Sequence, residues 1–180
     1  MRGVDHHLEA DRWFHATEVF LTGERATARA LGGLGVPKLG RFGHIAWELS
    51  LDGALLRAGN FDEALAGLRR DLDRLDLPAI VALAGPHGAE TLDAGARSRF
   101  QDRMRRIVEG LREGSWIAGY QHGDGLARRL EGIRERVGLP RLTPAAHRAV
   151  AETLEAQLAE AGERLPALLE DRRRHREAAP

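Results

Sequence analysis

Segment 44–56 constrains the fold more than any other part of the sequence, because it is apolar on nearly every side of a helix. Its polar residues His44, Glu48 and Asp52 are spaced four apart, and apart from Ser50 every residue between and after them is apolar or glycine. Positions four apart drift only about 40° around a helix, so these three side chains form one stripe. A helix that is apolar around the rest of its circumference is covered by protein. The segment therefore predicts a central helix with three buried polar side chains.

The composition favours a helical architecture for the whole chain. Aromatic residues make up 5% of the 180 residues, Ala, Leu, Arg and Glu dominate, and no alternating strand-like stretch is long enough to compete. Glycine, proline and capping residues place the expected helices at about 4–31, 41–57, 60 onward, 77–84, 90–111, 126–137 and 144 onward. The predicted fold class is all-α, a single-domain helical bundle over residues 1–169. A charged tail, 170–180, is expected to fray.

Charge and residue types exclude several classes of function. Lys+Arg and Asp+Glu both number 27, so the formal charge is zero and gives no electrostatic case for nucleic acid or an acidic membrane. No apolar run approaches the roughly 20 residues of a membrane span, and the N-terminus lacks the apolar region of a signal peptide. The absence of cysteine excludes disulfides and thiolate sites and agrees with a reducing compartment. We therefore expect a cytoplasmic protein with neither nucleic-acid nor membrane partners.

A second polar triad lies in the first expected helix. His7, Asp11 and His15 have the same four-residue spacing, and Glu18 returns to their stripe as a reserve ligand. Imidazole and carboxylate are ligands of Mn, Fe, Zn and Mg ions, and facing helices of a bundle are a usual place to assemble them. The two triads therefore predict one metal site. Its expected ligands are His7, Asp11, His15, His44, Glu48 and Asp52.

The alternative interpretation is a polar network in which these groups satisfy one another, with Arg12 or Arg41 neutralising some of the carboxylates. Buried carboxylates must be paired or must coordinate a metal. Because two matching triads lie on apolar faces, the metal site is the favoured interpretation.

Other polar residues are open to two interpretations. Trp116, Tyr120 and His122 could border a substrate pocket, although packing at a helix junction is the simpler explanation. An arginine run between positions 97 and 106 could receive an acidic carrier protein, but a solvated helix face is the default. The isolated histidines are expected at the surface: His87, His147 and His175.

Three segments resemble the acyl carrier protein phosphodiesterase family. Residues 3–11, GVDHHLEAD, resemble its Gly-Ile-x-x-His-x-x-x-Asp motif. Residues 44–56 resemble its second block, whose two acidic residues correspond to Glu48 and Asp52, and residues 116–120 resemble its Trp-x-x-x-Tyr segment. His15 stands where the family usually has an acidic residue, and Gly53 where it usually has His. The family carries further His and Asp residues ahead of this motif, and this chain begins almost at it, so we expect either a truncated or misassigned start or a divergent branch of the family that lacks this segment.

This resemblance implies an HD-like helical hydrolase that cleaves a phosphodiester with a divalent metal. The family releases 4′-phosphopantetheine from holo acyl carrier protein, so acyl carrier protein or a small phosphodiester is the expected partner. Mn²⁺ is the expected metal, with Fe, Zn or Mg as alternatives.

In the mechanism that we expect, one or two metal ions lower the pKa of a bound water, and the hydroxide attacks phosphorus. Glu48 or Asp52 is the general base, and His15 is a ligand or a proton donor to the leaving group. The alternatives are a non-catalytic helical metal-binding protein and a degenerate relative of the family.

Overall fold

The computed structural model describes residues 2–59, 94–113 and 115–178, together with Glu63, Ala66, Gly67, Arg70 and Arg74. This described part is helical and contains no strand, which confirms the all-α prediction for it. The chain divides into two compact units, one formed by residues 1–59 and 119–180 and the other by residues 60–118. The expectation of a single domain over residues 1–169 stays a prediction. The expected helix at 77–84 and the helix start at Asn60 lie outside the described residues.

Two helices replace the single helix expected over residues 4–31. Helix α1 spans Arg2–Ala16 and helix α2 spans Glu18–Gly32, with Thr17 extended between them at φ −69° and ψ 147°. The buried Thr17 hydroxyl donates to the Phe14 carbonyl at 2.8 Å and accepts from the Phe20 amide at 3.2 Å. A threonine that caps a new helix in this way ends the previous one. The prediction of one continuous helix is therefore wrong.

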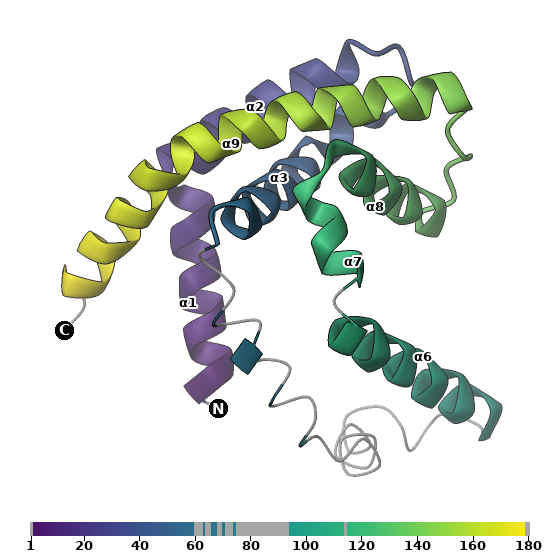
Figure 1. Cartoon of the computed structure of the whole chain (residues 1–180), viewed down its shortest axis with the longest axis horizontal. Helices are drawn as coiled ribbons and strands as arrows, with labels where there is room; N and C mark the ends of the chain where they lie inside the picture. The colour runs from purple at the N-terminus through teal and green to yellow at the C-terminus, as the bar shows by residue number, and fades with distance from the viewer. Residues whose placement is uncertain are drawn as a thin grey trace. The chain divides into compact units, whose positions relative to one another are not determined.

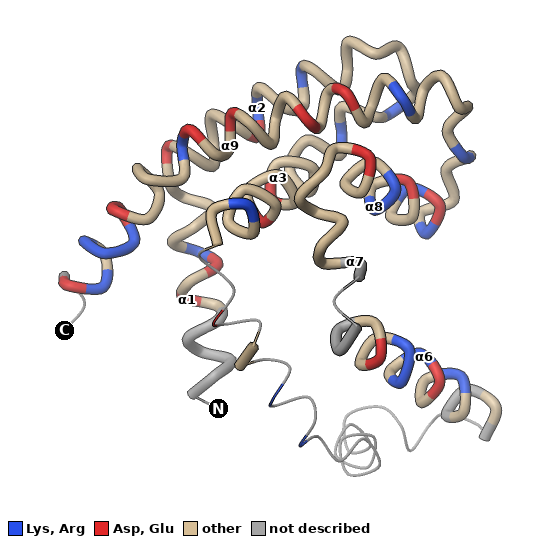
Figure 2. The backbone as a smooth tube through the Cα atoms, in the orientation of Figure 1, with Lys and Arg blue, Asp and Glu red and all other residues tan. Residues whose placement is uncertain are grey.

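Helix α3, Gly43–Arg57, lies at the centre of the first unit, as segment 44–56 predicts. A 3₁₀ turn, η1, spans Leu39–Phe42 just before it. Helix α2 and the later helices α8, Gly123–Arg136, and α9, Pro144–Ala178, all pack against α3 (Figure 1). Figure 2 shows α3 with few charged positions. Its core-facing side chains include Ala46, Trp47, Leu49, Leu51 and Ala54.

Helix α9 begins where the sequence predicts, because the Thr143 hydroxyl accepts from the Ala146 amide at 3.2 Å. The helix continues to Ala178, so the charged segment from residue 170 is helical in the structure. Figure 2 shows acidic and basic positions gathered at this end of α9. Arg173 there contacts both Glu170 and Glu177. Whether this end frays stays a prediction.

The second unit contains α6, Ala94–Glu113, and the short helix α7, Ser115–Ala118. The described arginines of α6 are exposed, in agreement with a solvated helix face: Arg99, Arg103, Arg105 and Arg106. The side chain of Arg97 lies outside the described part. Across the described residues of both units, no helix is both long and apolar enough to span a membrane.

Candidate metal centre

Three metal-ligand side chains from α1 and α3 meet in one place. His15, His44 and Glu48 each offer one ligand atom, and these atoms lie within 4.8 Å of one another. His15 Nε2 lies 2.8 Å from Glu48 Oε1, and His44 Nε2 lies 3.4 Å from the same oxygen. We call these three residues the His–His–Glu cluster. Both imidazoles therefore present the same nitrogen to one carboxylate oxygen.

The turn at Thr17 places an aromatic ring against both imidazoles of this cluster. The buried Phe20 ring has its centroid 4.6 Å from that of His15 and 4.9 Å from that of His44. The two imidazole centroids are 4.8 Å apart. An apolar ring packed against the histidines limits their movement and excludes water from one side of the cluster.

Two further carboxylates face the outer nitrogens of the histidines. Asp11 Oδ2 lies 3.6 Å from His15 Nδ1, and Glu24 Oε1 lies 3.4 Å from His44 Nδ1. Glu24 belongs to neither predicted triad, because in one continuous helix it would lie nine residues, or about 180°, away from His15. Only the break at Thr17 brings it to this side. Glu18, the reserve ligand, is exposed and stands outside the cluster.

The polar stripe of α3 is less buried than the sequence predicts. The side chains of His44 and Glu48 are 42% and 34% exposed, and Asp52 is exposed as well. The neighbouring helices cover the apolar faces of α3 and leave this stripe open, so the prediction of three buried polar residues is wrong. A metal bound here would have access to solvent.

Asp52 nevertheless has a strongly altered acidity. Loss of hydration, followed by the negative charge of Glu48 one turn earlier, raises the Asp52 pKa from 3.8 to about 6. The carboxylate keeps some solvent contact, but the protein around it still weakens the hydration of its charged form. A carboxyl group with a pKa near 6, beside ligand-type side chains, is suited to proton transfer near neutral pH.

The residue after Asp52 lies unusually close to the 3₁₀ turn η4, Gly119–Gln121. A Cβ atom at Gly53 would lie 2.1 Å from the carbonyl oxygen of Tyr120. The acyl carrier protein phosphodiesterase family usually has a histidine at this position. Such a side chain cannot be accommodated here without moving η4. Tyr120 is buried in the core, which agrees with packing at a helix junction. Burial raises the pKa of the Tyr120 hydroxyl above its usual 10, and the nearby charge of Arg129 opposes this effect.

The structure brings three of the six predicted ligands together in the cluster. His15, His44 and Glu48 form the cluster, Asp11 faces the outer nitrogen of His15, and Asp52 follows Glu48 on the same stripe. The side chain of His7 lies outside the described part of the chain, as does that of Trp116. Arg12 and Arg41, the expected neutralising partners, are exposed. Among the described residues neither forms an ion pair with these carboxylates.

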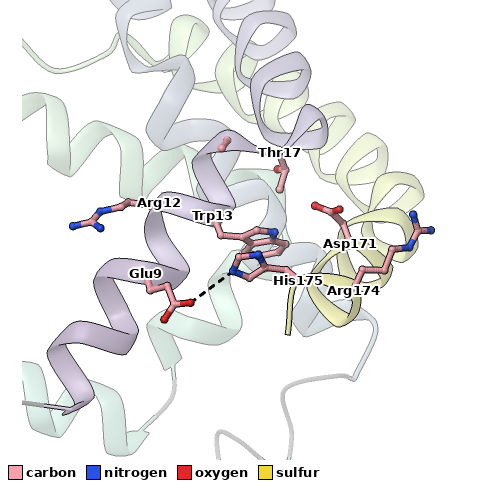
Figure 3. A pocket seen from close by; sticks show the side chains of 8 residues that line it. Glu9, Arg12, Trp13, Thr17, Asp171, Arg174 and His175 are labelled. Carbon is pink, nitrogen blue, oxygen red and sulfur yellow. Dashed lines mark ion pairs between the residues drawn. The ribbon is translucent and has the colours of Figure 1, made fainter. Parts of the chain in front are cut away.

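A cavity of about 600 Å³ lies on a different face of α1, against the C-terminal part of α9 (Figure 3). The Trp13 ring stacks on His175 at 5.8 Å, and Glu9 lies 3.8 Å from the His175 ring. In Figure 3 the side chain of Arg12 points away from these rings. His175 is therefore part of the α1–α9 contact, and its side chain is 37% exposed.

His147, which the sequence predicts at the surface, is half-buried and contacts two carboxylates of α8. Its Nδ1 lies 3.2 Å from Glu131 and its Nε2 lies 3.1 Å from Asp124, so it links α9 to α8. Each ring nitrogen faces a different carboxylate on opposite edges of the ring. This arrangement lacks the common point on which the ligand atoms of the His–His–Glu cluster converge.

The short contact between His15 and Glu48 has a chemical consequence. An unprotonated ring nitrogen and a carboxylate oxygen both carry lone pairs, so a 2.8 Å separation needs a proton or a metal ion between them. Metal–ligand bonds of about 2.0–2.2 Å place neighbouring ligand atoms roughly 3–3.5 Å apart. The spacings of 2.8 and 3.4 Å around Glu48 Oε1 are close to this range.

Comparison of the chain with protein-family models, curated proteins and solved structures found no match.

Proposed function

We propose that the protein is a metal-dependent hydrolase whose His–His–Glu cluster binds one divalent ion. The observation that carries the proposal is the convergence of two imidazole nitrogens on one carboxylate oxygen, supplied by α1 and α3. Two histidines and one carboxylate hold catalytic zinc or non-haem iron in proteins and leave coordination positions open. The partly open stripe of α3 is consistent with such access.

The proposed ligands are His15, His44 and Glu48, and a bound ion would lower the pKa of a coordinated water. Asp52 is the better general base of the two acidic residues, because Glu48 faces both histidines. With a pKa of about 6, the Asp52 carboxylate is largely ionised at neutral pH and can accept a proton from that water. His15, as a ligand, is then not the proton donor to the leaving group.

The substrate class rests on the sequence resemblance. It favours a phosphodiester, with release of 4′-phosphopantetheine from holo acyl carrier protein as the specific reaction, and an HD-like fold, while the absence of cysteine favours a cytoplasmic location. It also favours Mn²⁺, whereas two imidazole ligands suit Zn²⁺ or Fe²⁺ equally well.

The proposal can be tested with a generic phosphodiester. Chelator-treated protein is reloaded with Mn²⁺, Zn²⁺ or Fe²⁺ and assayed on bis-p-nitrophenyl phosphate, with bound metal measured in the same samples. We expect H44A to lose metal and activity together, and D52N to keep metal but lose about 10²–10⁴-fold in turnover. H147A is the matched control, because it removes a carboxylate-flanked histidine outside the cluster. Metal-loaded wild-type protein without turnover on this ester or on holo acyl carrier protein would contradict the hydrolase proposal.

One observation supports a second candidate, a non-catalytic protein or degenerate relative. The hydrogen bond between His15 and Glu48 already satisfies both groups without a metal. In that case the cluster is a structural polar network, or it binds metal for stability alone. Unchanged melting temperature on addition of Mn²⁺ or Zn²⁺ would favour the network. Metal-dependent stabilisation without hydrolysis would favour the structural metal site.

A further inference from the structure

We infer that Glu24 and Asp11 are positioning carboxylates that orient the two histidines of the cluster for metal binding through Nε2. This inference rests on the proposed function, because it concerns how the same site holds its ion. It assigns a role to Glu24, which belongs to no triad in the sequence. It also gives Asp11 a different role from the ligand role that spacing predicts.

The contacts of Glu24 carry the first step. Glu24 Oε1 lies 3.4 Å from His44 Nδ1, while His44 Nε2, on the other side of the ring, lies 3.4 Å from Glu48 Oε1. A carboxylate at Nδ1 favours the proton on that nitrogen and leaves the Nε2 lone pair free to bind a metal. Glu24 therefore selects both the tautomer and the orientation of His44.

Asp11 repeats this arrangement at the other histidine. Asp11 Oδ2 lies 3.6 Å from His15 Nδ1, and His15 Nε2 faces Glu48 Oε1 at 2.8 Å. Each histidine thus has a carboxylate at its outer nitrogen and the shared Glu48 at its inner nitrogen. Metal-binding histidines in proteins almost always have such an outer partner.

The two positioning residues differ in expected strength. The Glu24 side chain is 34% exposed and reaches His44 from a separate helix, α2. The Asp11 side chain is 48% exposed and lies one turn before His15 on the same helix. Water screens the more exposed Asp11 more strongly, and its 3.6 Å separation from His15 Nδ1 exceeds hydrogen-bond range. We therefore expect Glu24 to contribute more to metal affinity than Asp11.

The experiment measures Zn²⁺ affinity by competition with a chromophoric chelator. E24A is expected to weaken binding about 10–100-fold, the usual effect of removing an outer partner of a metal-bound histidine. E24Q should lose less, because its amide oxygen can accept a hydrogen bond from His44 Nδ1–H. D11N should show a smaller loss than E24A. E18Q is the matched control, since Glu18 is an exposed glutamate on the same helix outside the cluster.

A second measurement separates positioning from simple loss of structure. Nitrogen-15 NMR of the Zn²⁺-loaded wild type should show both histidines bound through Nε2 and protonated at Nδ1. If E24A unfolds, E24Q and the NMR tautomer assignment still decide the question. Wild-type Zn²⁺ affinity in both Glu24 variants, or His44 bound through Nδ1, would overturn this inference while the proposed function stands. Absence of Zn²⁺ binding in the wild type would overturn both.

Discussion

Replacing Gly53 with alanine tests how closely helix α3 packs against the 3₁₀ turn η4. The added Cβ would lie 2.1 Å from the Tyr120 carbonyl oxygen and 2.8 Å from Leu158 Cδ1. The leucine methyl group can rotate away, but the carbonyl belongs to the backbone of η4. Either α3 or η4 must therefore move by about 1 Å before the contact becomes tolerable.

The magnitude follows from two opposing terms. Overpacking of this kind lowers the free energy of unfolding by about 1–3 kcal/mol and occasionally more. A clash of 2.1 Å with backbone belongs at the upper end of that range, while the better helix propensity of alanine returns about 1 kcal/mol. The expected net loss is roughly 2 kcal/mol, or about 4–8 °C in melting temperature for a chain of this size.

Urea unfolding followed by circular dichroism measures this change at an unchanged m-value. The controls are G132A and G162A, two helical glycines with nothing within 4 Å of an added Cβ. Each control should gain up to about 1 kcal/mol from helix propensity alone. If G53A unfolds at the same urea concentration as these controls or a higher one, the close approach of α3 to η4 is refuted.

Three further predictions concern stability in the metal-free protein. D52N should be more stable than the wild type at pH 8 and equal to it near pH 4. The raised Asp52 pKa means that the wild type loses stability as pH rises from 3.8 through about 6. Solvent screening limits the stability advantage of D52N to about 1 kcal/mol, which urea titrations at several pH values measure. T17A should lower the free energy of unfolding by about 1 kcal/mol, because it removes the cap of α2, whereas T17S should unfold like the wild type. E155Q should be less stable than the wild type at pH 7, with the gap closing as pH falls below 4.5. The hydrogen bond from Arg57 and that from the Gly123 amide lower the Glu155 pKa, so its contribution is present above the unfolded value of 4.5.

The central helix could be predicted from sequence because its signal is local and repeated. Segment 44–56 has a polar residue at positions 44, 48 and 52, and apart from Ser50 apolar residues and glycine fill the rest of its circumference. The same regularity placed His44 and Glu48 on one stripe, and the structure brings both into the cluster with His15.

The start of α2 could not be predicted from the same kind of pattern. No glycine or proline marks a helix end at Thr17, and its hydroxyl ends α1 through contacts with Phe14 and Phe20. Because the break changes the direction of the chain, every inference that assumed one helix across it failed. Glu24 was missed for this reason, and Glu18 was wrongly placed on the stripe.

The exposure of the polar stripe could not be predicted from the sequence either. The number of apolar residues around α3 predicts that neighbours cover the helix, but it does not say which narrow face they leave open. That face is decided by where α2, α8 and α9 pack. The close approach at Gly53 depends on the same packing, since Tyr120 is 67 positions away along the chain.

The most direct test of the account is a metal titration of chelator-treated protein. Wild type, H15A, H44A, E48A and the control H147A are titrated with Zn²⁺ and with Mn²⁺ by calorimetry, and bound metal is quantified after gel filtration. We expect one tightly bound ion per chain in the wild type and in H147A, and loss of that ion in each of the three cluster variants. A wild type that binds neither ion, or an H44A variant that binds as tightly as the wild type, would contradict it.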